Sequence, residues 1–319
     1  MDGILNINKP VGLTSHDVVA RVRRLLHQQR VGHAGTLDPL ARGVLPICVG
    51  LATRVADYLS ESGKAYQAEI VLGRETDTYD REGRLLNERP VPDFTREQLE
   101  SVLSTFLGPQ LQVPPPYSAI KLQGEPAYRR ARAGESLKLE ARPVVIERLV
   151  LLAWEKPRLL LEIECSKGTY IRSLAHDLGQ RLGCGASLNA LLRTRSGPLT
   201  LQESITLEQL AEAVESGHLA HYLRPLDIAL QHYPALVVDA KTLQRVLHGN
   251  SFRAPGPESG PLPARASLPG WRENASRQEE QPRLARVCDE QGRTWALAAW
   301  KPELQLWQPT RVFGPERRS

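Results

Sequence analysis

The chain has 319 residues and a mass of 35.5 kDa, enough for one large domain and a small one, and its hydrophobic fraction of 41% supports a sizeable core. Its net charge of +5 suits an anionic partner such as nucleic acid, and it shows neither a transmembrane run nor a signal peptide. The four cysteines are widely spaced without a C-x-x-C pair, which argues against a zinc ribbon or a disulfide framework and fits a reducing cytosol.

The first elements in chain order are a strand and a helix. Residues 4–8 alternate between apolar and polar side chains, which predicts a strand. Thr14 and Asp17 have the spacing of a capping box and precede an apolar stripe through Leu26, which predicts a helix. Arginines between residues 21 and 30 add positive charge, and they fit a solvated helix face as well as contacts to nucleic acid.

The stretch over residues 31–47 presents one acid, Asp38, in a constrained loop. Three glycines permit backbone angles that other residues avoid, and Pro39 keeps Asp38 out of the helical region. The apolar run over 44–49 predicts a buried strand. A lone Asp-Pro more often forms an ordinary turn whose carboxylate only bonds the backbone. The interpretation of Asp38 therefore depends on the rest of the chain.

The middle of the chain predicts a strand over 64–72, a polar surface loop over 73–90 and a helix that begins after Thr95. The loop contains Asp80 among several acids. Their spacing is not the alternate spacing of an EF-hand calcium loop, so ordinary loop chemistry is the interpretation we favour.

The next part of the chain mixes both element types. Strands are predicted over 144–154 and 159–165, and a helix over 170–182. An apolar stretch over 188–192 and a further helix from Thr206 follow. Because strands and helices are interspersed without a regular βαβ repeat, the sequence indicates an α+β fold with a mixed sheet.

The pattern changes near residue 223, and we predict two domains, 1–225 and 226–319. The second domain begins with a short helix, and residues 284–300 predict a β-hairpin that a further strand follows. This domain is therefore expected to be small and rich in β-structure. Residues 255–282 are rich in Pro, Gly, Ser and charge and are predicted to be a flexible insertion.

Four motifs occur in order along the first domain. They are Lys9-Pro10, the stretch from Gly32 to Pro46, Lys64-x-Tyr66, and Ser166-Lys-Gly-Thr-Tyr-Ile-Arg172. With these motifs the chain, over roughly residues 1–225, resembles the bacterial tRNA pseudouridine-55 synthases, the TruB family. The resemblance implies an α+β pseudouridine synthase domain whose mixed, mainly antiparallel sheet is flanked by helices. It also implies a small β-rich PUA-like C-terminal domain that binds RNA.

The resemblance also implies roles for individual residues. Asp38 corresponds to the family's catalytic aspartate, and Arg172 to the arginine that pairs with it. Tyr66 corresponds to the tyrosine that stacks on the target base and is implicated in the proton step at its C5. Substrate-binding roles are implied for the pocket residues Tyr170 and Leu191, and for His33, which contacts the RNA where the base leaves its stack.

Three residues depart from the usual family pattern. Ala34 and Arg42 stand where threonine is usual, and Arg54 stands where lysine is usual. These departures leave the catalytic set intact. Each member of that set, taken singly, also fits an ordinary structural role, so the functional interpretation depends on their joint occurrence.

The implied reaction breaks the N-glycosidic bond of a uridine, turns the base over and rejoins it through C5. Nothing is oxidised and no phosphate is spent, so no cofactor and no metal are expected, and no Walker A or Rossmann glycine pattern occurs. The reaction needs an ionised carboxylate, and attack at C6, attack at C1′ and a glycal route all remain open. Arg172 is expected to keep Asp38 charged, whereas a reference pKa of about 10 makes Tyr66 a poor base.

The expected substrate is the T-arm of tRNA, whose uridine at position 55 is flipped into the pocket. Basic segments near 21–30, 129–132 and 193–195 are expected to follow phosphates. We expect a cytoplasmic monomer with no obligate protein partner and no membrane association. Two alternatives remain open: an RNA-binding protein that assists tRNA folding with little or no catalysis, and a guide-RNA-dependent relative of the archaeal and eukaryotic type.

Overall fold

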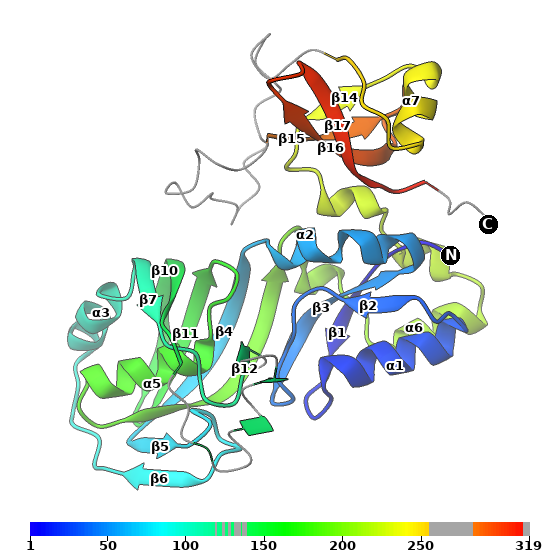
Figure 1. Cartoon of the computed structure of the whole chain (residues 1–319). Coiled ribbons are helices and arrows are strands. Elements are labelled where there is room, and N and C mark those ends of the chain that lie inside the picture. Colours follow the sequence, from blue (N-terminus) through cyan, green and yellow to red (C-terminus); the bar gives the residue numbers. More distant parts are fainter. Residues whose placement is uncertain are drawn as a thin grey trace.

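The computed structural model describes residues 1–118, 120–122, 125–126, 129–130, 135, 139–254 and 283–314. Its first sheet has nine strands: β1 (Gly3–Lys9), β2 (Val31–His33), β3 (Ala41–Val49), β4 (Lys64–Leu72), β7 (Gly108–Gln112), β10 (Arg142–Glu155), β11 (Arg158–Cys165), β12 (Ala186–Ser196) and β13 (Leu199–Thr200). Their order is β1-β3-β12-β4-β11-β10-β7, with β2 paired to β3 and β13 paired to β12 (Figure 1).

The sheet is mixed. Among its described strands, β3 and β12 pair in parallel through Leu191↔Ala41, Leu192↔Arg42 and Arg193↔Gly43, and the other pairs are antiparallel. The predicted α+β class with a mixed, mainly antiparallel sheet is therefore confirmed. The apolar stretch predicted over 188–192 forms the middle of β12, next to both β3 and β4.

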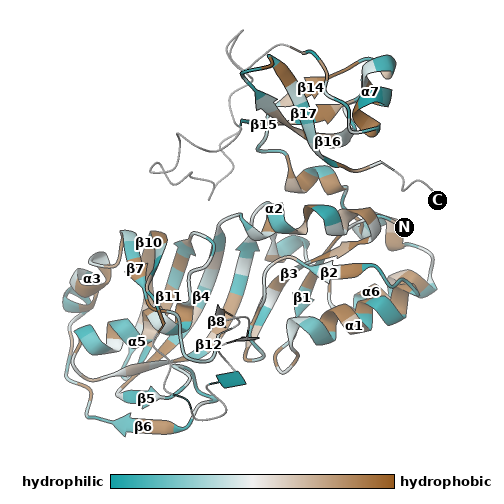
Figure 2. Cartoon of the chain, in the orientation of Figure 1, coloured by the Kyte–Doolittle hydropathy of each residue, from teal (hydrophilic) through white to brown (hydrophobic). Residues whose placement is uncertain are grey.

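Four helices pack on one face of this sheet. They are α1 (Ser15–Leu26), α3 (Arg96–Ser104), α5 (Ile171–Arg181) and α6 (Leu207–Glu215), and each contributes leucines or valines to one core cluster with β1, β3, β4, β11 and β12. Figure 2 shows hydrophilic and hydrophobic stretches alternating along these helices, as expected of helices that bury one side. The predicted capping boxes of Thr14 and Thr95 begin α1 and α3.

The opposite face of β1 and β3 is covered by η1 (Gly50–Val55), α2 (Ala56–Ser60) and η4 (Leu226–Ala229). A second core cluster forms here, and Leu297 and Phe313 from the C-terminal part of the chain belong to it. Arg54 Nη1 donates to Val312 O at 2.8 Å, and Arg311 Nη1 donates to Arg54 O at 2.6 Å. The C-terminal sheet is thus attached directly to η1.

The C-terminal sheet has four strands in the order β14 (Ala235–Val237), β15 (Leu284–Cys288), β16 (Thr294–Lys301) and β17 (Leu306–Val312), with α7 (Ala240–Leu247) beside them (Figure 1). Trp307 is fully buried in its core. The predicted hairpin and following strand are confirmed. The predicted insertion over 255–282 lies outside the described residues, as do positions 131–132 of one predicted basic segment, and the boundary at 225/226 stays a prediction.

The polar segment over 73–90 is more ordered than a surface loop. It contains the two-stranded sheet of β5 (Arg74–Thr76) and β6 (Leu85–Glu88), and its Asp80 is only 4% exposed. Bridge contacts with Leu188 hold Asp80 to β12. The remaining elements are β8 (Lys121–Leu122), β9 (Glu125–Pro126), η2 (Leu201–Glu203) and η3 (Leu219–Tyr222). No helix among the described residues is long and apolar enough to span a membrane.

Candidate active site

The loop that carries Asp38 is fastened to the N-terminus of α1. Ser15 Oγ accepts a hydrogen bond from Leu37 N at 2.8 Å and lies 3.1 Å from Leu37 O, to which it donates. Gly12 N donates to Pro39 O at 2.8 Å. Both neighbours of Asp38 are therefore fixed through their backbone, which leaves its carboxylate to face other partners.

Lys9, of the Lys9-Pro10 motif, has a structural role beside the loop of Asp38. Its ammonium group is fully buried and donates to the carbonyl oxygens of Pro10 at 2.8 Å, Leu13 at 2.7 Å and Pro39 at 3.4 Å. Burial lowers the pKa of Lys9 to about 8, although the negative charge of Asp38 opposes this shift. Lys9 thus ties the end of β1 to the loop that carries Asp38.

Arg193 fastens the same loop from the other side. The guanidinium, 1% exposed, donates to Val44 O at 2.6 Å, Gly35 O at 3.1 Å and Thr36 O at 3.4 Å. Gly43 allows the backbone of β12 to lie close to β3 at Arg193. It has a φ of +104°, and a Cβ at this position would lie 2.3 Å from Arg193 O. The expectation that residues 193–195 follow phosphates is therefore wrong for Arg193, whose charge lies inside the protein.

Arg172, in the first turn of α5, connects two carboxylates. Its Nε lies 2.9 Å from Asp38 Oδ2, an ion pair that is not aligned as a hydrogen bond. Its Nη1 lies 3.6 Å from Asp80 Oδ2 and donates to Thr78 O at 3.3 Å, and its Nη2 donates to Tyr117 O at 3.0 Å. Four groups from three segments, Asp38 among them, therefore hold this guanidinium in place.

Asp80 is a residue that the sequence analysis missed. Burial raises the pKa of this carboxyl, while a hydrogen bond from Thr78 and the charge of Arg172 act in the opposite direction. Thr78 Oγ1 donates to Asp80 Oδ1 at 2.7 Å, and Glu82 N donates to the same atom at 3.0 Å. The acid-rich composition of the segment concealed this role, because a buried acid and a solvated one look alike in sequence.

Tyr66 lies on β4 directly opposite Arg193 of β12. Burial raises the pKa of its hydroxyl to about 12, and the charge of Arg193 and a side-chain hydrogen bond with it oppose that shift. The hydroxyl therefore stays protonated at neutral pH. Tyr66 as a whole is 8% exposed.

Lys64 precedes Tyr66 on the same face of β4. Its ammonium group donates to the carbonyl oxygens of Ser60 and Ser62. Burial is the main cause that lowers the pKa of Lys64 to about 7, and the positive charge of Arg193 adds to it. A second residue that the sequence analysis assigned no role thus lies beside the predicted stacking tyrosine.

Tyr170 is placed by Gln112 of β7. Gln112 Oε1 accepts from Tyr170 N at 2.8 Å, and Gln112 Nε2 donates to Tyr170 O at 3.0 Å. Tyr170 precedes the first residue of α5, so this pair of hydrogen bonds also fixes where that helix begins. Burial raises the pKa of the Tyr170 hydroxyl.

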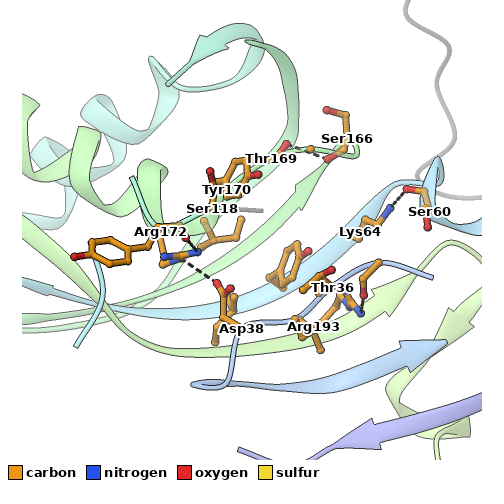
Figure 3. Close-up of a pocket in the computed structure, with 17 residues that line it drawn as sticks. Thr36, Asp38, Ser60, Lys64, Ser118, Ser166, Thr169, Tyr170, Arg172 and Arg193 are labelled. Atoms are coloured by element: carbon orange, nitrogen blue, oxygen red, sulfur yellow. Dashed lines mark hydrogen bonds and ion pairs between the residues drawn. The ribbon is translucent and has the colours of Figure 1, made fainter. Parts of the chain in front are cut away.

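These segments enclose a cavity of about 270 Å³. Five of the six predicted site residues line it, namely Asp38, Tyr66, Tyr170, Arg172 and Leu191. Figure 3 shows Asp38 and Arg172 pointing toward one another, with Lys64 and Ser60 on the opposite side of the pocket. The side chain of Asp38 is 37% exposed, so the carboxylate is accessible from the cavity although its partner is buried.

His33, the sixth predicted residue, is not part of the cavity lining. It ends β2, its Nδ1 is buried without a hydrogen-bond partner among the described residues, and burial is the main cause that lowers its pKa. The described part of the chain holds no group of three or more His, Cys, Asp or Glu residues suited to a metal ion. The cavity offers an accessible carboxylate, a fixed guanidinium, an aromatic ring and an apolar wall, a set suited to acid–base or nucleophilic chemistry on a flat ring.

Comparison with known proteins identifies relatives of both the sequence and the fold. A family model described as TruB family pseudouridylate synthase (N terminal domain) matches residues 23–171, and one described as tRNA pseudouridylate synthase B C-terminal domain matches residues 172–231. A tRNA pseudouridine synthase B from Stutzerimonas stutzeri is 47% identical over 258 residues, which cover 80% of this chain and 84% of the relative. One from Geobacter sulfurreducens is 45% identical over 249 residues, covering 78% and 82%.

Solved structures with a similar fold belong to ribonucleoprotein complexes. A chain of an H/ACA RNP bound to a substrate RNA containing 2′-deoxyuridine matches with a TM-score of 0.71 and 25% identity, covering 99% of this chain and 86% of that chain. A chain of an archaeal box H/ACA sRNP complex matches with the same TM-score and 24% identity, covering 99% and 87%. The latter likeness concerns the fold alone.

Proposed function

The chain belongs to the TruB family of pseudouridylate synthases, and we propose that it isomerises the uridine at position 55 in the T-loop of tRNA to pseudouridine. In this reaction the N1–C1′ bond breaks and a C5–C1′ bond forms. The proton on C5 is lost and N1 gains one, so the product has the composition of the substrate. The relatives are named for tRNA as the substrate, and the position and the residue roles are the proposal.

The observation that carries the proposal is the Asp38–Arg172 pair at the cavity. The carboxylate lies 2.9 Å from a buried guanidinium and still faces the cavity. Attack or proton removal needs an ionised carboxylate, and the guanidinium is the counter-charge beside it. Asp38 therefore acts on the nucleotide directly, while Arg172 pairs with it and orients it.

The other cavity residues receive and hold the base. A uridine within a folded RNA loop reaches Asp38 only when it leaves its stack. The ring of Tyr66 and the side chain of Leu191 supply the aromatic and apolar surfaces that a flipped base needs. Tyr170 closes the same cavity from the start of α5, and His33 contacts the RNA outside the cavity.

We further propose that the chain acts as a monomer on the T-arm, with residues 1–225 carrying catalysis and 226–319 a PUA-like RNA-binding domain. The exposed arginines of α1, Arg21 and Arg24, face the phosphates of the substrate. Binding that depends on these charges weakens as the salt concentration rises.

The decisive experiment measures tritium release from C5-tritiated uridine in unmodified tRNA. Wild type is compared with Asp38→Asn and with Asp93→Asn, a control acid that forms an exposed ion pair with Lys156. We expect near-stoichiometric release by wild type and by the control, none by Asp38→Asn, and equal tRNA binding by all three. A tRNA with cytidine at position 55 should abolish release.

Other results would contradict the proposal in different ways. Tight tRNA binding without release by wild type would leave the folding-helper function as the explanation. Equal release by wild type and Asp38→Asn would show that another residue is the catalytic acid.

A further inference from the structure

Two aromatic rings outside the cavity stack on one another. Tyr79 and His176 have ring centroids 4.0 Å apart and an interplanar angle of 9°. His176 lies on α5, four residues after Arg172, so both side chains leave the same side of the helix. Tyr79 belongs to the segment between β5 and β6. The stack therefore connects the helix of the site arginine to a segment distant in sequence.

Tyr79 stands between two groups that contact Arg172. Thr78 O accepts a hydrogen bond from Arg172 Nη1 at 3.3 Å, and Asp80 Oδ2 lies 3.6 Å from the same nitrogen. Any displacement of Tyr79 therefore moves both neighbours. The ring of His176 is the partner that limits such a displacement on the side of α5.

The backbone of Tyr79 makes this restraint necessary. Its φ of +63° is in the left-handed region, which a residue with a side chain adopts only when its surroundings hold it there. Tyr79 O accepts from Leu188 N at 3.0 Å, and Tyr79 N donates to Thr76 O at 3.2 Å. The backbone bonds and the ring stack together hold this conformation.

We infer that Tyr79 and His176 form a positioning pair, which keeps Thr78 and Asp80 against the guanidinium of Arg172 and so directs its Nε toward Asp38. The inference deepens the proposed function and depends on it. His176 Nδ1 is buried without a hydrogen-bond partner among the described residues, so the face of the ring is the part of His176 that contributes. A flat ring without nitrogen atoms should therefore replace it.

The test compares His176→Ala with His176→Phe in single-turnover assays with enzyme in excess over tritiated tRNA. His176→Ala should slow the reaction by about 5- to 10-fold, the range expected for loss of one aromatic contact. The dissociation constant for tRNA should stay unchanged, and His176→Phe should recover most of the wild-type rate. His218→Ala, which removes a histidine stacked on His221 away from the cavity, is the matched control and should react at the wild-type rate.

A double variant tests the route of the effect. If His176 acts through the partners of Arg172, adding His176→Ala to the Asp80→Asn enzyme should slow the reaction far less than adding it to wild type. The contact between Asp80 and Arg172 that His176 positions is already lost in the Asp80→Asn enzyme. Equal factors in both backgrounds, a wild-type rate for His176→Ala, or a failure of phenylalanine to restore the rate would each overturn the inference. An inactive wild-type enzyme would instead refute the proposed function, so the two failures are distinguishable.

Discussion

Asp80 and Arg172 lie side by side in the interior of the protein, with side chains that are 6% and 7% exposed and with Oδ2 and Nη1 3.6 Å apart. A buried guanidinium needs compensation for the water that it has lost. Asp80 supplies a second acidic neighbour, so Arg172 does not depend on Asp38 alone for its place. This leaves Asp38 free to change its contacts during a reaction without leaving an isolated buried cation.

Replacing Asp80 with asparagine should therefore slow catalysis without preventing tRNA binding. The amide keeps the shape and removes the charge that holds Arg172. We expect the single-turnover rate to fall by roughly 10- to 100-fold, because a buried guanidinium loses one of its two charged neighbours. Asp77→Asn, in the same segment, is the control, because Asp77 accepts from Arg84 N instead. A wild-type rate for Asp80→Asn would show that Arg172 keeps its place without the charge of Asp80.

The hydroxyl of Tyr66 should contribute no ionisation to the pH profile. Burial raises its pKa to about 12, so the group stays protonated through the neutral range in the free enzyme. The kcat/KM of wild type divided by the kcat/KM of Tyr66→Phe should therefore be constant between about pH 6 and pH 9. A ratio that changes tenfold per pH unit within that range would show that the tyrosine acts as an ionised base.

Lys64 should make stability depend on pH. Its pKa of about 7 in the folded chain lies below the reference value of 10.5, so between these values the unfolded chain binds more protons. Stability then rises with pH in this window, by at most about 1.4 kcal/mol per pH unit, and the contribution is flat below pH 7. Urea unfolding at pH 6.5 and pH 9 measures this rise for wild type and Lys64→Met. Between pH 6.5 and pH 9 the free energy of unfolding should rise more for wild type than for the variant. A difference in unfolding free energy that is the same at both pH values would refute the lowered pKa of Lys64.

Gly43 should be intolerant of a side chain. A Cβ at this position would lie 2.3 Å from Arg193 O, so alanine would push apart β3 and β12 as well as strain a φ of +104°. Gly217→Ala is the control, because Gly217 has a φ of +75° with nothing within 4 Å of its Cβ. The control should lose about 1 kcal/mol of unfolding free energy and Gly43→Ala several times as much. Equal losses in denaturant titrations would show that the strands can separate there.

Helices and strands whose sequence signals lie within a few residues could be predicted from the sequence alone. Capping boxes at Thr14 and Thr95 begin helices, and the run over 64–72 is a strand, because these patterns depend on side chains a few positions apart. The mixed sheet followed from the order of such elements and from the family resemblance.

The unpredicted part of the site depends on tertiary burial. Asp80 lies in a polar segment and Arg193 in a basic one, and both patterns favour solvent exposure, yet both side chains are buried. Each is buried because another distant segment supplies its partners, Arg172 for Asp80 and the carbonyl oxygens of residues 35, 36 and 44 for Arg193. A pattern of neighbouring residues in the sequence does not indicate which distant segments will contact them. The roles of Asp38, Tyr66 and Arg172 stay predictions until the variants are assayed.

The parallel pairing of β3 with β12 has a consequence for biosynthesis. Arg193 and Val44, which it brings into contact, are separated by 149 positions in the chain. Contacts between such distant segments form late, because the intervening chain must be synthesised and closed into a loop first. A nascent chain that ends before β12 holds Asp38 without the strand that fastens its loop. The contacts that fasten this loop therefore form only after most of the first sheet has left the ribosome, and a truncated translation product that ends before β12 lacks them.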